Sequence, residues 1–164
     1  MQSQPAALCL ICALAPVLAC GDNDPKPDAE HEDPAEHACE HTGESGDAVS
    51  AGAERDASAP EIELGDDPYT VALRDGEPGY VRIEVDEDTP VLLFASAANV
   101  VTSLYHEDEE EEIDGAGANE FCDDDIPEHF DLDLHEPGTY YLQLGPSALD
   151  EVWILVTEAE GHSH

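Results

Sequence analysis

Hydrophobic and polar residues alternate in short runs over the second two-thirds of the chain. The alternation is strictest in residues 80–85 and 129–135, where every second side chain is apolar. Side chains two positions apart lie on the same face of a β-strand, so this period predicts half-buried strands. Similar short apolar runs predict further strands at residues 69–74, 91–95, 100–105, 139–144 and 152–156.

Gly- and Pro-containing segments separate these runs, as in residues 75–79, 86–90 and 136–138. Residues 152–156 are apolar on both faces, which predicts a central strand or one under a covering loop. No stretch shows a convincing helical period. The pattern therefore predicts an all-β fold, a small antiparallel, jelly-roll-like β-sandwich spanning residues 60–158.

Two parts of this pattern resemble a known family. Residues 73–85 resemble the opening hairpin of bacterial pre-peptidase C-terminal domains. Residues 137–144, followed by the last strand at 152–156, resemble the closing hairpin of the same domains. The resemblance covers roughly residues 66–157. It implies a binding or accessory module outside the cell, of a kind commonly appended to a secreted enzyme.

The N-terminal segment has the pattern of an export signal. Residues 5–19 are uncharged and largely apolar, too short a run for a transmembrane helix of ~20 residues, and residues 1–19 are therefore predicted to be a signal peptide. The sequence Val17-Leu18-Ala19-Cys20 resembles a lipobox. This resemblance implies a bacterial lipoprotein with a lipid on Cys20, in the cell envelope. The alternative is an ordinary signal peptide with an unmodified Cys20.

Gly21 follows the cysteine, which favours the outer membrane, on its periplasmic or surface side. The lipid anchor would make the membrane a partner. Residues 20–59 contain few large apolar side chains and many Asp, Glu, Pro, Ala, Gly and Ser residues. Such a segment buries little surface, so we expect a flexible acidic tether, except at residues 36–41 if Cys39 is bonded. Residues 159–164 are predicted to be a free tail.

Only two of the five cysteines remain as candidates for a disulfide bond. Cys9 and Cys12 lie in the predicted signal peptide, and Cys20 would carry the lipid. Cys39 and Cys122 remain, and outside the cytoplasm they are predicted to form a disulfide. The alternative is two independent thiols, one of them a metal ligand.

The charge of the chain excludes some partners. There are 41 Asp and Glu residues against four Lys and Arg, a net charge of −37. Nucleic acid is excluded as a partner because a phosphate backbone needs basic residues to neutralise it. No Gly-x-Ser-x-Gly, His-Glu-x-x-His or phosphate-binding glycine loop occurs, so we predict no catalytic residues and no enzyme activity.

Imidazoles and carboxylates make a divalent cation (zinc, copper or calcium) the one candidate cofactor. In residues 129–135, His129, Asp131, Asp133 and His135 are predicted to share one outward face. The two histidines would be about 20 Å apart along a strand, too far for one ion. A site would need one His, an adjacent Asp and a ligand from a neighbouring strand. The alternative, a polar face in solvent, is favoured.

Two other segments are weaker metal candidates. His37 and His41 flank Cys39, and His31, His162 and His164 lie in the predicted flexible parts of the chain. For the first group, a disulfide with incidental neighbouring histidines is the favoured interpretation. The long acidic connection at residues 106–128 suits calcium, although a solvated loop is the favoured interpretation.

These observations predict a lipid-anchored envelope protein with a non-enzymatic binding or structural role. One alternative is a metal-binding lipoprotein of the periplasm or cell surface that uses His and carboxylate ligands. Another is an accessory module for a secreted enzyme. A protein or a glycan is the expected type of partner for the sandwich.

The charge predicts a salt-dependent stability. Residues 60–157 contain 27 acidic residues and only two arginines. The excess negative charges repel one another in the folded state. Salt shortens the Debye length to about 8 Å at physiological ionic strength and screens this repulsion. We expect the melting temperature to rise from low salt to seawater-like salt. An unchanged melting temperature would contradict this prediction.

Overall fold

The computed structural model describes residues 33–159, and strands dominate this part of the chain. It has one short helix and ten strands. Their bounds are α1 Pro34–Glu40, β1 Asp47–Ser50, β2 Tyr69–Ala72, β3 Gly79–Val85, β4 Thr89–Ala95, β5 Val101–His106, β6 Glu109–Glu111, β7 Asp114–Gly117, β8 Glu128–Leu134, β9 Gly138–Leu144 and β10 Glu151–Glu158.

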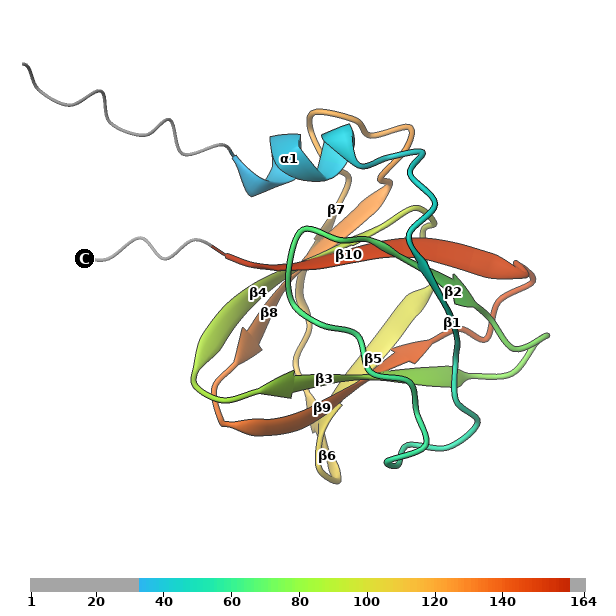
Figure 1. Ribbon diagram of the computed structural model, residues 1–164, viewed down its shortest axis with the longest axis vertical. Coiled ribbons are helices and arrows are strands. Elements are labelled where there is room, and N and C mark those ends of the chain that lie inside the picture. The colour runs from blue at the N-terminus through green and yellow to red at the C-terminus, as the bar shows by residue number, and fades with distance from the viewer. Residues whose placement is uncertain (1–32, 160–164) are drawn as a thin grey trace, which may run out of the picture. The chain divides into compact units, whose positions relative to one another are not determined.

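The strands form two sheets that pack face to face (Figure 1). The larger sheet has the order β1-β2-β10-β4-β8-β7, and the smaller has the order β3-β9-β5-β6. Neighbouring strands are antiparallel except β1 and β2, which run parallel. The predicted all-β sandwich is confirmed. Among residues 33–159, no helix is long and apolar enough to cross a membrane.

The chain passes from one sheet to the other at most turns. β2 pairs with β10 in the larger sheet, whereas β3 pairs with β9 in the smaller one. The segments expected to be an opening and a closing hairpin therefore connect strands in different sheets, and the hairpin prediction is wrong. Turn residues show where the chain reverses, but they do not show which strands pair.

The core between the sheets follows the predicted alternation. Phe130, Leu132 and Leu134 of β8 are buried, whereas Asp131 and Asp133 are exposed. β3 alternates in the same way, with three aliphatic side chains inward. Fully burying one such side chain stabilises a fold by about 1.5–3 kcal/mol, so these positions specify which face of each strand packs inward.

A second, smaller apolar cluster lies on the outer face of the larger sheet. Leu155 of β10 and Phe94 of β4 pack there against Ala38 of α1 and Ile126 of the β7–β8 connection. α1 lies above β10 in Figure 1, on the side away from β3 and β9. The prediction that residues 152–156 form a central, covered strand is confirmed, since β10 lies between β2 and β4.

α1 is short and needs support from outside itself. Asp33 caps it by accepting a hydrogen bond from the Ala35 N–H at 2.9 Å, and Pro34 occupies the first turn. Helices of this length are marginal in water. Cys39 of α1 is bonded to Cys122 of the β7–β8 connection, and buried Asn119 donates to the Ala35 carbonyl at 2.7 Å. The predicted disulfide is confirmed, and the two-thiol alternative is wrong.

Two sequence-based expectations need correction. Residues 33–59 are not a flexible tether, because they include α1, β1 and the buried residues Ala38 and Ala59. Residues 106–128 are not wholly irregular, because β6 and β7 lie within them. Both segments are poor in large apolar side chains and order through small residues, strand pairing and the disulfide. Residues 20–32 of the predicted tether and residues 160–164 of the predicted tail lie outside the described part of the chain.

Removal of the disulfide should lower the free energy of unfolding by a large amount. The disulfide joins residues 83 positions apart, and the chain-entropy estimate for such a loop is about 4 kcal/mol. We expect the double variant Cys39→Ala/Cys122→Ala of the full chain to lose free energy of unfolding of this order in urea titration. An unchanged free energy of unfolding would show that α1 is held by packing alone.

Candidate functional site

The outer face of the larger sheet carries a cavity of about 640 Å³ beside the C-terminal end of α1. We call it the Trp153 cavity. The residues that line it come from the loop after α1, from β1, β2 and β10, and from two further connections. They are Thr42, Gly43, Glu44, Ser45, Gly46, Ala48, Thr70, Ser96, Asp125, Glu151 and Trp153.

Trp153 is the large aromatic residue of this cavity. It stands on the outward side of β10 and packs at the edge of the small cluster under α1. Its backbone N–H donates to the Ser96 hydroxyl, and its carbonyl accepts from the Ser96 N–H, both at 3.0 Å. The indole Nε1 is buried and has no hydrogen-bond partner in the described part of the chain. The ring is therefore held by packing and by its strand.

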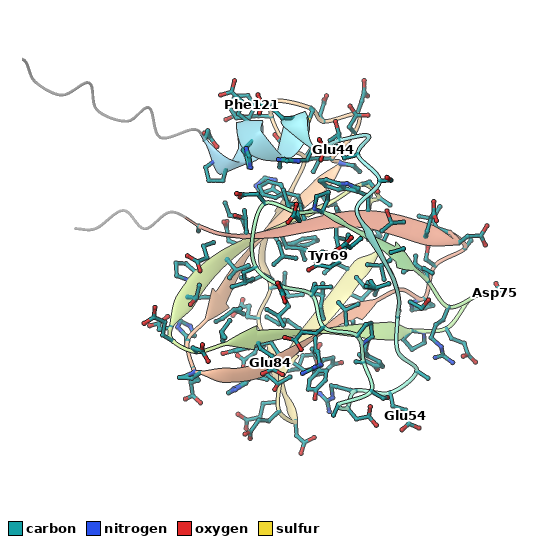
Figure 2. All side chains as sticks on the ribbon, viewed as in Figure 1. Glu44, Glu54, Tyr69, Asp75, Glu84 and Phe121 are labelled. Atoms are coloured by element: carbon teal, nitrogen blue, oxygen red, sulfur yellow. A yellow bond between two sulfur atoms is a disulfide. The ribbon has the colours of Figure 1, made fainter. Side chains whose placement is uncertain are left out.

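The loop after α1 forms one wall of the cavity, and its path depends on local contacts. The Thr42 hydroxyl donates to the Cys39 carbonyl at 2.9 Å. Gly46 lies so close to β2 that a Cβ there would be 2.2 Å from the Pro68 carbonyl oxygen. A larger residue would push the loop away from β2. Figure 2 shows Glu44 just beyond the end of α1.

The electrostatic character of the cavity is acidic. Glu44, Asp125 and Glu151 contribute carboxylates, and four Ser and Thr residues contribute hydroxyls. None of the described residues that line the cavity is Lys, Arg, His or Cys. The arrangement favours a cation or a neutral polar molecule over an anion.

The outward face of β8 does not act as one metal site. His129 stacks on Phe94 with ring centroids 6.0 Å apart, and its Nδ1 is buried without a partner among the described residues. Asp131 is exposed beside β7, where Asp114 is its partner in register. His129 and Asp131 belong to no three-residue ligand group in residues 33–159.

The other end of this face does form a cluster, which we call the Asp88 cluster. His135 Nδ1 lies 3.1 Å from Asp133 Oδ1. Asp88, in the turn before β4, joins them, and candidate ligand atoms of the three residues all lie within 4.8 Å of one another. All three side chains are exposed. The cluster contains one His and a nearby Asp of β8, and its third member, Asp88, comes from a turn rather than from a neighbouring strand and was not predicted.

His37 and His41, flanking the disulfide, are brought together. Their Nε2 atoms lie 3.3 Å apart. Glu44 Oε2 is 2.9 Å from His41 Nδ1, and Asp66 Oδ1 is 3.5 Å from His37 Nε2. Cys39 contributes no thiolate, because it is in the disulfide. His31, His162 and His164 lie outside the described residues, as does Cys20.

The acidic connection at 106–128 is partly structured and holds no three-residue ligand group within the described residues. Asp108 faces Arg55, whose guanidinium lies 4.2 Å from the centroid of the Tyr105 ring. Arg55 thus attaches the 51–59 segment to β5. The interpretation as a solvated acidic segment remains the favoured prediction for its other carboxylates.

Comparison with known proteins adds no family. No protein-family model matches the chain, and no curated protein is detectably similar to it. Sequence reasoning missed the Trp153 cavity. The one signal was a lone tryptophan at an outward position of a strand predicted to be covered.

Proposed function

We propose that this chain is a non-enzymatic binding protein of the bacterial cell envelope, anchored by a lipid on Cys20, whose sandwich binds a small cationic organic ligand in the Trp153 cavity. The residue pattern around Cys20 supports the anchor, and the Cys39–Cys122 disulfide fits a compartment outside the cytoplasm. The observation that carries the binding role is the cavity itself, with an indole and three carboxylates at one place.

The lining residues support a cation as the ligand. A tryptophan face attracts an ammonium group, with about 0.5–2 kcal/mol from the cation–π interaction. Carboxylates of Glu44, Asp125 and Glu151 surround the same space, and no described lining residue is basic. The net charge of −37 raises the local concentration of cations around the whole protein. The volume of the Trp153 cavity, about 640 Å³, is within the range of about 300–1,000 Å³ common for ligand sites.

The same lining supports recognition rather than catalysis. Nucleophilic catalysis needs a nucleophile with an adjacent base, and histidine is the usual base. The described lining residues include no His or Cys, and the Ser96 hydroxyl is engaged by the Trp153 backbone. The proposed role is therefore to hold the ligand at the membrane surface.

The proposal predicts selective binding of ammonium compounds. We expect tetramethylammonium and butylamine to perturb the fluorescence of the single tryptophan and to titrate in calorimetry, whereas glucose does neither. Trp153→Phe should weaken binding about threefold, because a phenyl ring keeps only part of the cation–π attraction of an indole. Glu151→Gln should weaken it less and reduce its dependence on salt.

Matched controls separate binding from folding. Trp153→Phe should fold normally, because the indole Nε1 makes no hydrogen bond that the variant would lose. Tyr141→Phe, on the smaller sheet, should bind like the wild type. Glucose binding in place of ammonium binding would overturn the cationic class of ligand. Unchanged affinity in Trp153→Phe would overturn the site.

The Asp88 cluster supports a second candidate function, divalent-cation binding. One imidazole and two carboxylates suit zinc or copper. All three side chains are exposed, so the cluster is neither rigid nor shielded from water before an ion binds. We therefore propose that it binds a divalent cation weakly and exchangeably. The accessory-module alternative stays a prediction from the family resemblance alone.

The Asp88 cluster predicts that His135→Ala lowers the affinity of this cluster for zinc about tenfold, because the imidazole is its only nitrogen ligand. Asp88→Asn should act in the same direction. His129→Ala is the matched control, since His129 lies on β8 outside the cluster, whereas Asp133 of β8 belongs to it and His135 directly follows the strand. Equal effects of His129→Ala and His135→Ala in calorimetry would show diffuse attraction of counterions instead.

A further inference from the structure

We propose that His37 and His41, with Asp66 as a third ligand, form a zinc- or copper-binding site at the C-terminal end of α1. This site adjoins the Trp153 cavity, with which it shares Glu44, and it shares no residue with the Asp88 cluster. It adds a tighter and more rigid site for a transition-metal ion to the weak, exchangeable metal binding proposed above.

The helix places the two imidazoles for one ion. Residues four apart lie on the same face of an α-helix, one turn from each other. His37 lies in the last turn of α1, and His41 caps its end. Their Nε2 atoms are 3.3 Å apart. Two nitrogens bound to zinc at about 2.0–2.1 Å in tetrahedral geometry would be about 3.3–3.4 Å apart. The pair already has the separation that the ion requires.

Glu44 prepares His41 to act as a ligand. Its Oε2 lies 2.9 Å from His41 Nδ1, so this nitrogen donates and holds the ring proton. The neutral ring then carries its lone pair on Nε2, the atom that faces His37. A carboxylate behind a metal-binding histidine is the usual way in which proteins set the tautomer and orientation of the ring.

Asp66 supplies an anionic oxygen from another part of the chain. Its Oδ1 is 3.5 Å from His37 Nε2, and its side chain is 76% exposed. The candidate ligand atoms of His37, His41 and Asp66 do not all lie within 4.8 Å of one another in the described structure. The exposed Asp66 side chain must therefore rotate toward the two histidines to complete the site, and water can fill the fourth position. The two histidines are far less exposed, at 25% and 21% of their side-chain surface.

The surroundings give this pair a rigidity that the Asp88 cluster lacks. Cys39 lies between the two histidines and is bonded to Cys122, while Ala38 is buried against the larger sheet. The backbone of both ligands is therefore held before any ion binds. Two imidazoles and one carboxylate select zinc or copper over calcium, which prefers six to eight oxygen ligands.

Zinc titration of the full oxidised chain tests the proposal. We expect one equivalent to bind more tightly than the rest, and His37→Ala/His41→Ala to lose this phase. His41→Ala alone should weaken it at least tenfold, and Glu44→Gln about tenfold through loss of orientation. His135→Ala is the matched control and should leave the tight phase unchanged. Trp153→Phe should also keep it, which separates this site from the cavity.

A measurement on the wild-type chain avoids any failure of a variant to fold. During zinc addition, the ring proton resonances of His37 and His41 should shift together and saturate at one equivalent. Those of His106 and His129 should not move with them. A tight phase that survives His37→Ala/His41→Ala would overturn the proposal, as would unshifted His37 and His41 resonances. Titration without any tight phase would overturn it equally.

Discussion

The outer face of the larger sheet depends on one covalent constraint, the disulfide between Cys39 and Cys122. A helix of seven residues does not persist alone in water, and the apolar surface of α1 is small. The disulfide joins α1 to the β7–β8 connection, and both then cover Phe94 and Leu155. The hydrogen bond from Asn119 to Ala35 reinforces the same junction. Without this junction, β10 would expose an apolar surface on its outer side.

The same constraint positions the chemistry. Residues 42–46 leave α1 and form one wall of the Trp153 cavity. His37 and His41 lie on either side of Cys39, and Glu44 lines the cavity while it orients His41. The proposed ammonium-binding cavity and the proposed metal site thus share one carboxylate and one rigid support. In a chain with a net charge of −37, a cation bound at either proposed site would replace part of the repulsion between carboxylates by attraction.

The sequence predicted the features that depend on local pattern. Period-two alternation identified the inward faces of β3 and β8, and the double-sided apolar run identified β10 as a covered strand. Elimination among five cysteines identified the disulfide. The hairpin pairing predicted from the sequence was wrong. A turn sequence such as residues 75–79 has the same residue types whether it closes a hairpin or connects strands of different sheets. α1 and β1 were missed because a scarcity of large apolar side chains was taken to predict a flexible segment. Ala38 is small, yet it packs against the larger sheet. The Asp88 cluster and the Trp153 cavity form where loops meet in space. Hydrophobic periodicity along the chain does not predict such contacts between loops.

The central claim is that the disulfide-linked α1 organises the outer face of the larger sheet. Comparing amide and indole spectra of the full chain, oxidised and reduced, tests it most directly, because one tryptophan gives one indole signal. We predict that reduction shifts the Trp153 indole and the amides of residues 33–46 and 118–127, while the amides of β3 and β9 stay unchanged. Shifts confined to Cys39, Cys122 and their immediate neighbours would contradict the account.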